Sequence, residues 1–176
     1  MTTLRPFKAD DLWAFNRVNL DPLTETYHMT FYLQYMYTWP EYFTVAESAA
    51  GTLMAYVMGK AEGVGENWHG HVSALTVAPE YRRLGLGKQL MADLEDISEH
   101  RHHGYFVDLF VRKSNDVAVE LYRGLGYEIY RTVIEYYSGA NSEDAYDMRK
   151  SLSRDPEKRL MQPTGKRIQP YELEND

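Results

Sequence analysis

The sequence predicts an α/β (α+β) fold in a single domain, with a central mixed twisted sheet flanked by helices. Three observations lead to this class. Strand-like and helical hydrophobic spacings alternate along the chain, so that strands lie on both sides of each helix. A strand, a glycine-rich turn and a helix start follow one another in Ala74–Gly87, which reads ALTVAPEYRRLGLG. At 176 residues, the chain is long enough to bury the core of one domain.

The elements before this turn follow from local patterns. Thr3–Phe7 is predicted as a short opening strand, and Asp10 or Asp11 is expected to cap a helix that runs to Leu20. The apolar side of that helix is formed by Leu12, Trp13, Phe15 and Val18. A loop over Asp21–Tyr27 and a helix over Phe31–Trp39 are expected next. Two strands follow, over Tyr42–Glu47 and Thr52–Lys60, joined by a turn at Ser48–Gly51. A polar loop over Gly63–Asn67 then leads to a central strand over His71–Ala78.

The second half begins with a helix whose apolar face is formed by Leu86, Leu90, Leu94 and Ile97. Tyr105–Arg112 reads as a buried strand, in which Asp108 needs a partner for its charge. The next helix begins at Ser114–Asn115 and ends at Gly126, and its apolar face is expected to be formed by Val117, Leu121 and Leu125, with Ala118 and Tyr122 beside it. The last elements are strands over Tyr127–Tyr137 and Ala145–Arg149 around an exposed Ser138–Asp144 loop.

The composition changes near the end of the chain, which divides it into a domain over 1–152 and a tail over 153–176. Prolines and charges of both signs alternate in the tail, so we expect it to be disordered or docked on a partner.

Charge and composition exclude several classes of protein. The formal net charge of -7 makes nucleic acid an unfavourable direct partner. The chain has no cysteine, which excludes disulfides, a thiolate metal site and a cysteine nucleophile. No apolar run is long enough to span a membrane, and the charged start lacks the features of a signal peptide, so we expect a cytoplasmic protein.

The turn in Ala74–Gly87 has the features of an anion site. The first N–H groups of a helix have no internal partner, and the helix dipole adds partial positive charge there. Gly85 and Gly87 allow close approach of a ligand, and Arg82, Arg83 and Lys88 add a local basic groove to an acidic chain. This contrast favours a small anionic cofactor. The loop matches neither a Walker A nor a Rossmann phosphate motif.

Two motifs resemble the GCN5-related N-acetyltransferase (GNAT) superfamily. The spacing R-x-x-G-x-G at Arg82, Gly85 and Gly87, after a strand ending in V-x-P, resembles its acetyl-CoA pyrophosphate loop. Asn115, Ala118 and Tyr122, followed by Leu125-Gly126-Tyr127, resemble its second motif. The resemblance implies a GNAT fold, acetyl-CoA as cosubstrate and no metal.

Longer segments resemble the catalytic subunits of NatB-type N-terminal acetyltransferases from Thr2 to about Ser153. The segments are LDPLTETY, WPEYF, WHGHVSAL, VDLFVR, RTVIEYYS and DAYDMRK. This resemblance implies acetyl transfer to the α-amine of nascent polypeptides that begin Met-Asp, Met-Glu, Met-Asn or Met-Gln. It also implies a heterodimer with a large helical-repeat auxiliary subunit that holds the enzyme at the ribosome.

Three residues are candidates for the chemistry of amine attack on a thioester. An α-amine titrates near 7.7–8, so a modest general base is sufficient. His71 on the central strand is the first candidate base, and Glu25 is the second. Tyr122 matches the tyrosine that serves as general acid in many relatives, and its ordinary pKa near 10 keeps it protonated. For each, the alternative is a merely structural role.

The remaining site residues are assigned by their contacts. The cofactor is expected to contact Leu75, Val77, Arg82, Arg83, Leu84, Gly85, Leu86, Gly87, Lys88, Asn115 and Tyr122. The substrate is expected to contact Glu25, Tyr27, Tyr56, His71, Tyr136 and Tyr137. Tyr136 and Tyr137 are adjacent in a strand, so both can line one pocket only if the strand bulges.

Two other functions remain open on the sequence. One is a GNAT enzyme that acts on a lysine, a polyamine or a ribosomal protein. The other is a non-catalytic, acetyl-CoA-binding scaffold subunit, which the intact loop and Tyr122 disfavour. For an auxiliary subunit, the predicted helices over Asp11–Leu20 and Phe31–Trp39 are the expected contact, because their apolar residues exceed what one face needs.

Overall fold

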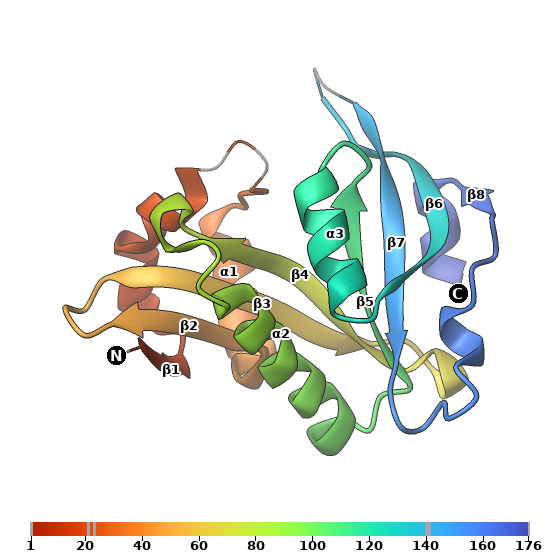
Figure 1. Ribbon diagram of the computed structural model, residues 1–176, viewed down its shortest axis with the longest axis horizontal. Helices are drawn as coiled ribbons and strands as arrows, with labels where there is room; N and C mark the ends of the chain where they lie inside the picture. The colour runs from red at the N-terminus through yellow and green to blue at the C-terminus, as the bar shows by residue number, and fades with distance from the viewer. Residues whose placement is uncertain (1, 21, 23, 140–141, 176) are drawn as a thin grey trace. The chain divides into compact units, whose positions relative to one another are not determined.

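The structure, a computed structural model, describes residues 2–20, 22, 24–139 and 142–175. Within these residues, eight strands form one sheet in the order β1-β2-β3-β4-β5-β7-β6-β8 (Figure 1). The strands are β1 (Thr2–Pro6), β2 (Phe43–Ser48), β3 (Leu53–Glu62), β4 (His69–Val77), β5 (Phe106–Arg112), β6 (Glu128–Tyr137), β7 (Glu143–Ser151) and β8 (Arg167–Ile168). The α-helices of the same ranges are α1 (Met29–Thr38), α2 (Leu86–Asp96) and α3 (Asp116–Gly124). The predicted α/β class with a mixed sheet is confirmed.

The chain forms two compact units. One comprises the residues up to Lys60 together with Val72–Ile97, and the other comprises Ala61–His71 together with the chain from Ser98 onward. The division passes through β3 and β4, so each of these strands contributes residues to both units. The predicted central strand, β4, begins at His69 rather than His71.

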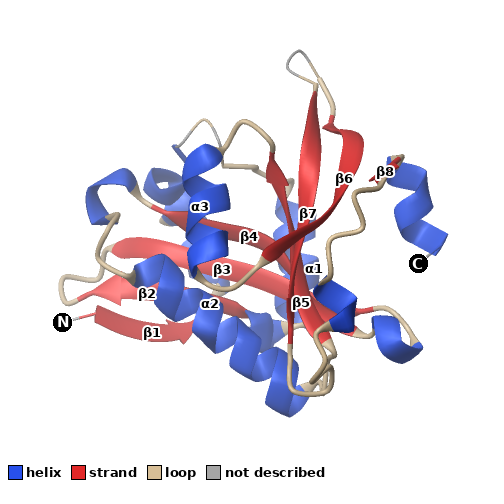
Figure 2. Cartoon of the chain, turned by 45° about the vertical axis from the view of Figure 1, so that its right-hand side comes forward, coloured by secondary structure: helices blue, strands red, loops and turns tan. Residues whose placement is uncertain are grey.

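In the first unit, β1 and β3 both pair antiparallel with β2. Helices α1 and α2 lie on opposite faces of these strands (Figures 1 and 2). Aromatic rings dominate the core: Phe7 stacks on Phe43 with ring centroids 3.9 Å apart, and Tyr56 contacts both rings. The core also contains Leu12, Phe15, Val18, Tyr32, Tyr35, Val45, Leu53, Met58 and Ala78. The large area that aromatic side chains bury makes this cluster a major source of stability for the unit.

The prediction of one continuous helix from Asp10 or Asp11 to Leu20 is wrong. The segment forms two 3₁₀-helices, η1 (Ala9–Trp13) and η2 (Phe15–Leu20). Residues three apart eclipse one another in a 3₁₀-helix. This explains why the predicted residues Leu12, Phe15 and Val18 are all buried, whereas Trp13 is 78% exposed. Asp11 lies inside the first turn and accepts hydrogen bonds from the Lys8 amide and the Arg5 guanidinium.

In the second unit, β5 and β6 pair antiparallel with β7, and β8 runs parallel to β6. Asn115 caps α3, since its side chain accepts a hydrogen bond from the Ala118 amide at 3.2 Å. Gly126 follows the helix at a φ of 93°, as expected for a helix end. The predicted apolar face of α3 is wrong. The buried residues are Val119 and Tyr122, while Val117 is 82% and Leu121 is 39% exposed, because packing selects the i, i+3 row rather than the i, i+4 row.

The tail forms three short elements that pack on the second unit. They are η7 (Arg159–Met161), β8 and η8 (Pro170–Asn175). The Asp155 carboxylate accepts hydrogen bonds from the Ser151 hydroxyl and the Leu160 amide, and Ile168 is buried against Val133. The described part of the tail is therefore docked on its own chain, and docking on a partner stays a prediction. Asp21 and Leu23 of the first expected loop, and Ala140 and Asn141 of the Ser138–Asp144 loop, lie outside the described residues.

Candidate active site

The turn after β4 has the backbone of an anion-binding helix start. Gly85 precedes α2 with a φ of 82°, a left-handed conformation that favours glycine. Its carbonyl accepts the first helical hydrogen bond, from Gln89 at 3.0 Å. The amides of Leu86, Gly87 and Lys88 therefore lie before the first intrahelical bond and have no acceptor within the helix. Together with the helix dipole, these amides favour an anionic ligand.

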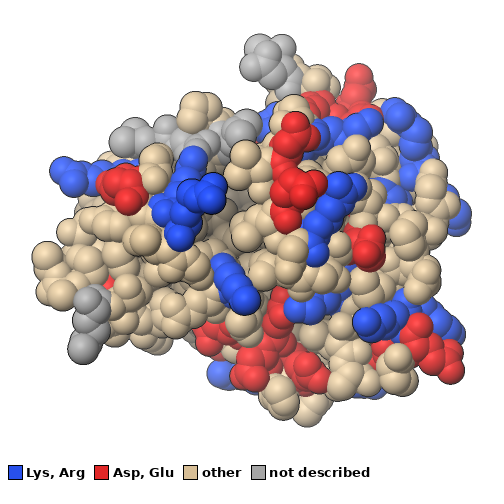
Figure 3. All heavy atoms as spheres, in the orientation of Figure 1, with Lys and Arg blue, Asp and Glu red and all other residues tan. Residues whose placement is uncertain are grey.

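The side chains of this turn add positive charge at an exposed position. Arg82 donates to the Val77 carbonyl at 3.2 Å, and both Arg83 and Lys88 are exposed, as are Leu84 and Gly85. On the face drawn in Figure 3, basic and acidic side chains are interspersed rather than separated into large fields of one sign. Such a surface suits a small anion better than a polyanion.

Another part of the first unit places an aromatic cluster against β4. The Tyr27 hydroxyl donates to the Ser73 carbonyl at 3.1 Å, and the Tyr35 hydroxyl lies 2.6 Å from the Ser73 Oγ. The Tyr27 ring stacks on Phe31 with centroids 4.3 Å apart. Glu25, just before Tyr27, is half-buried. On β4 itself, the predicted cofactor contacts Leu75 and Val77 are half-buried.

Tyr56, a predicted substrate contact, lies in the core of the first unit. Tyr56 is 1% exposed, and its hydroxyl donates to the Asn19 Oδ1 at 2.8 Å. Burial raises the pKa of this phenol. The ring is part of the aromatic core of the first unit and presents no surface to a ligand.

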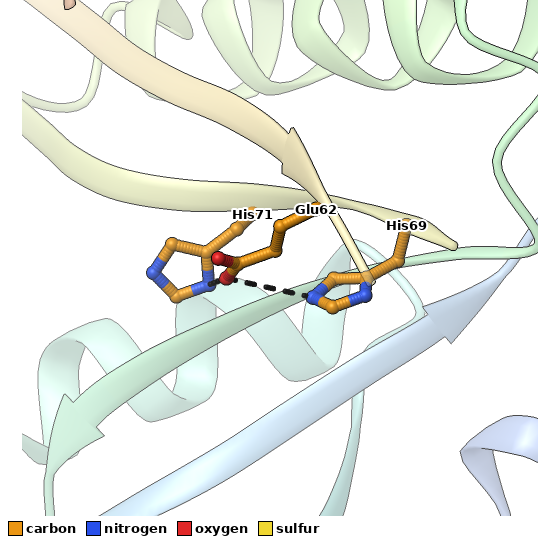
Figure 4. Close-up of side chains that lie close together, drawn as sticks. All are labelled: Glu62, His69 and His71. Atoms are coloured by element: carbon orange, nitrogen blue, oxygen red, sulfur yellow. Dashed lines mark ion pairs between the residues drawn. The ribbon is translucent and has the colours of Figure 1, made fainter. Parts of the chain in front are cut away.

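The second unit contains a buried polar cluster around Asp108. The Asp108 Oδ1 lies 2.7 Å from the His71 Nδ1 and 3.3 Å from the His69 Nε2. The Glu62 Oε1 faces the same two imidazoles, at 3.9 Å from the His71 Nδ1 and 3.8 Å from the His69 Nε2 (Figure 4). His69, His71 and Asp108 are each less than 9% exposed. The partner that the sequence requires for Asp108 is therefore a pair of histidines.

The contacts of this cluster fix where its protons lie. Burial would raise the pKa of Asp108, but the His69 and His71 imidazoles outweigh it and hold this pKa well below its ordinary value. Asp108 is then an acceptor only, so the His71 Nδ1 donates and its Nε2 is the nitrogen that can accept a proton. Burial lowers the pKa of His69, yet Asp108 and the Asn67 carbonyl together raise it above its ordinary value. His69 and His71 are thus the two groups that stabilise the ionised Asp108 carboxylate.

A bulge in β6 brings two predicted substrate residues onto one aromatic cluster. The pairing of β6 with β7 shifts between Val133 and Tyr137, and Glu135 has a φ of 49°. Tyr136 packs on Phe110 with centroids 4.8 Å apart, and the Tyr137 hydroxyl donates to the Phe110 carbonyl at 3.2 Å. The His71 ring also contacts Phe110, at 5.3 Å. The condition set by the sequence, that both tyrosines can face one pocket only if the strand bulges, is met.

Tyr122 and Asn115 lie on the helix that the second motif predicts. Tyr122 is 8% exposed on α3, and its ring packs edge-on against Tyr127 with centroids 5.9 Å apart. Burial raises the pKa of Tyr122, so the phenol carries its proton at neutral pH. Asn115 has an observed role as the cap of α3.

Sequence reasoning missed Glu62, His69 and Phe110. A signal existed for His69, since residues two apart in a strand point to the same face and the chain reads His69-Gly70-His71. Glu62 and Phe110 become recognisable only when β3, β4 and β5 are placed in the fold. Although no metal was expected, the ligand atoms of Glu62, His69 and His71 all lie within 4.8 Å of one another.

Comparison with known proteins shows the family of the chain. The acetyltransferase (GNAT) family matches residues 10–127. The chain is 57% identical to the "N-terminal acetyltransferase B complex catalytic subunit NAA20" of Arabidopsis thaliana over 176 residues, which is all of both chains. The chain is a GNAT acetyltransferase of the NatB catalytic-subunit family.

Solved structures of this family have the same fold. The crystal structure of Chaetomium thermophilum Naa20 in complex with a bisubstrate analogue matches with a TM-score of 0.91 and 41% identity, over 97% of this chain and 98% of that chain. A NatB acetyltransferase complex bound to CoA and MES matches with a TM-score of 0.77 and 40% identity, over 85% of this chain and 99% of that chain. Among the described residues, no helix has the length and apolar character needed to cross a membrane.

Proposed function

We propose that this protein transfers the acetyl group of acetyl-CoA to the α-amino group of protein N-termini, as the catalytic subunit of a NatB-type complex. The observation that supports this most directly is the match, over 97% of the chain, to a NatB-family structure in complex with a bisubstrate analogue. The expected substrates begin Met-Asp, Met-Glu, Met-Asn or Met-Gln.

The cofactor site is the turn before α2. The amides of Leu86, Gly87 and Lys88 and the side chains of Arg82 and Arg83 bind the pyrophosphate of acetyl-CoA. The β4 backbone at Leu75 and Val77 holds the pantetheine arm as an added strand would be held, and Leu84, Asn115 and Tyr122 complete the contacts. The exposure of Arg82–Gly85 supports this role, since a charged ligand can reach the turn without a rearrangement.

His71 acts as the general base through its Nε2. The Asp108 carboxylate fixes the proton of His71 on Nδ1 and orients the ring, so that Nε2 is ready to accept a proton from the amine, directly or through water. Glu25 is the alternative base, or orients the amine.

Attack of the neutral amine on the thioester carbonyl forms a tetrahedral oxyanion, which a backbone N–H of β4 stabilises. When this intermediate collapses, the C–S bond breaks and the sulfur of CoA leaves as a thiolate. Tyr122, which burial keeps protonated, donates a proton to the thiolate. The phenolate then takes a proton from solvent, and His71 releases the amine proton to solvent, so the enzyme returns to its starting state.

The substrate peptide is bound by the tyrosine and glutamate side chains that the sequence predicts. Tyr136 and Tyr137 form one wall with Phe110, and Glu25 and Tyr27 lie in the segment before α1. The half-buried Glu25 can pair with the α-ammonium group before it loses its proton.

An auxiliary subunit binds through the exposed apolar side chains of η1 and α1. Trp13 is 78% and Tyr37 is 90% exposed, and Met29 and Leu33 are each 43% exposed. Such exposed apolar groups mark a protein interface. The auxiliary subunit is a large helical-repeat protein that holds the enzyme at the ribosome in the cytoplasm.

The test is acetyl transfer by the complex with its auxiliary subunit to a panel of peptides that begin Met-Asp, Ser or Met-Leu, together with an internal-lysine peptide. Transfer to the Met-Asp peptide alone is expected. Strong transfer to a different amine, with little to Met-Asp, would make the protein a GNAT enzyme of another substrate class. Cofactor binding without transfer to any amine would make it a scaffold subunit.

A further inference from the structure

The polar cluster around Asp108 has more ligands than a general base needs. One carboxylate is sufficient to orient His71, but His69 and Glu62 face the same point. The ligand atoms of Glu62, His69 and His71 lie within 4.8 Å of one another, and the Asp108 Oδ1 lies 2.7 Å and 3.3 Å from the two imidazole nitrogens. Figure 4 shows the two rings of β4 on either side of the Glu62 carboxylate.

These distances are near those of a tetrahedral zinc site. Ligands at 2.0–2.2 Å from Zn²⁺ lie about 3.3 Å from one another. The four separations that join a carboxylate oxygen to an imidazole nitrogen, 2.7–3.9 Å, bracket this value, and the ligand atoms of Glu62, His69 and His71 all lie within 4.8 Å of one another, so side-chain movements must bring them together around an ion. Two imidazole nitrogens and two carboxylate oxygens suit Zn²⁺ better than Mg²⁺ or Ca²⁺, which prefer oxygen ligands.

The surroundings of the cluster favour a bound ion. The His69 Nδ1 donates to the Asn67 carbonyl at 2.6 Å, the orienting contact that metal-binding histidines commonly make. Phe106 stacks on His69 with centroids 4.6 Å apart and holds the ring in place. The side chain of Glu62 is 38% exposed, while those of the other three ligands are 10% exposed or less, so an ion enters past Glu62.

We infer that Glu62, His69, His71 and Asp108 form a binding site for a single zinc ion, which inhibits acetyl transfer when it binds. Zinc replaces the protons on the His69 Nε2 and the His71 Nδ1. Asp108, which would otherwise face nitrogen lone pairs, becomes the fourth ligand. A neutral imidazole that binds zinc through Nδ1 carries its proton on Nε2, so His71 can no longer accept a proton from the amine. The inhibition rests on the proposed function, whereas the binding does not.

Binding is tested on the full chain after treatment with a chelator. Calorimetric titration with Zn²⁺ is expected to give one ion per chain, and Co²⁺ is expected to give the visible absorption of a four-coordinate ion that zinc abolishes. Glu62→Gln and His69→Gln are each expected to weaken zinc binding about tenfold or more. The matched control His103→Asn removes an exposed imidazole at a φ of 53°, which asparagine tolerates, and is expected to change nothing.

Inhibition is tested with the complex and a Met-Asp peptide, each rate being compared with that of the same variant without metal. Zinc is expected to stop transfer by the unmodified enzyme and the His103→Asn variant, and Glu62→Gln is expected to need at least about tenfold more zinc. Absence of stoichiometric binding, or binding equally tight in Glu62→Gln and His69→Gln, would overturn the site. If zinc binding is weakened by Glu62→Gln and His69→Gln but zinc does not inhibit acetyl transfer, the regulatory role is overturned. If the metal-free complex acetylates no peptide while zinc binds, the proposed function fails and the site stands.

Discussion

β4 has ionisable groups near both of its ends, in two different environments. At its start, His69 and His71 are buried and share the carboxylate of Asp108. Beyond its end, Arg82 and Arg83 are exposed in the turn that leads to α2. The groups at the start contact one another in the interior, whereas the arginines of the turn are exposed to solvent, where we propose that they bind the cofactor.

This difference separates proton transfer from ligand binding. A group that moves a proton works best when its dipoles are fixed before the reaction, as buried hydrogen bonds allow. A group that binds a phosphate gains most from a charge that the ligand supplies. We therefore expect substitutions at the start of β4 to lower kcat, and substitutions in the turn after β4 to raise the KM for acetyl-CoA.

The largest effect is expected from His71→Ala, which removes the proposed general base. At about pH 7, kcat should fall about 100-fold or more with little change in the KM for acetyl-CoA. The deficit should narrow above about pH 8, because a larger fraction of the α-amine is then neutral without help. Steady-state rates with a Met-Asp peptide across this pH range measure both effects. A raised KM with kcat unchanged would place His71 in binding and remove the contrast between the two ends of β4.

Asp108→Asn tests whether the buried carboxylate positions that base. The amide keeps the size of the side chain but loses the charge that fixes the His71 proton on Nδ1, so kcat should fall about tenfold or more at unchanged KM. Because the change leaves His69 without its counter-charge, the melting temperature is measured in parallel. A loss of stability with full activity per folded molecule would make Asp108 a structural residue only.

Tyr122→Phe tests whether a buried side chain of α3 also takes part in proton transfer. The phenyl ring fills nearly the same space and the pKa of the lost phenol was raised by burial, so the substitution removes a proton donor with little change in packing. We expect kcat to fall about 100-fold while acetyl-CoA binds as before by calorimetry. Unchanged turnover would leave Tyr122 as a packing partner of Tyr127.

Much of this arrangement could be predicted from the sequence, because the signals are local. The strand, turn and helix around Gly85 depend on residues a few positions apart, and the need of Asp108 for a partner follows from its place in an apolar strand. The 3₁₀-helices over 9–20 could not be predicted, since a row spaced by three residues fits both helix types.

Long-range packing accounts for the other errors. In α3, the predicted row that begins at Val117 and the buried row that begins at Val119 both have helical spacing. Which of the two rows is buried depends on the tertiary packing of the helix. Glu62 and Phe110 join the site only through the order of β3, β4 and β5 in the sheet. Tyr56 looks like a pocket residue in the sequence because burial cannot be read from a tyrosine alone.

A smaller effect is expected in the turn after β4. Arg82→Ala and Arg83→Ala should each raise the KM for acetyl-CoA about tenfold, because each loses a charge-assisted contact to phosphate at an exposed site, with kcat within about twofold of the unmodified enzyme. The difference should shrink with added salt. Arg101→Ala, another exposed arginine, is the control. A fall in kcat at unchanged KM would mean that the turn contributes to the chemical step, as is proposed for the start of β4, and not to cofactor binding.

The smallest effect on activity is expected from Asp11, a buried carboxylate with no proposed part in the reaction. Burial would raise the pKa of Asp11, but hydrogen bonds from Arg5 and the Lys8 amide outweigh it and lower this pKa. A carboxyl whose pKa is lower in the folded state stabilises the protein above its unfolded pKa, about 3.9, and this contribution is lost as the pH falls below that value. Asp11→Asn should therefore reduce the free energy of unfolding by about 1–2 kcal/mol at neutral pH and flatten its decline below about pH 4. Denaturant titrations at several pH values measure this change, and kcat and KM should stay as they are. If Asp11→Asn lowered kcat as Asp108→Asn does, the loss of any buried, paired carboxylate would explain both results. The proposal that Asp108 positions the His71 imidazole would then lose its support.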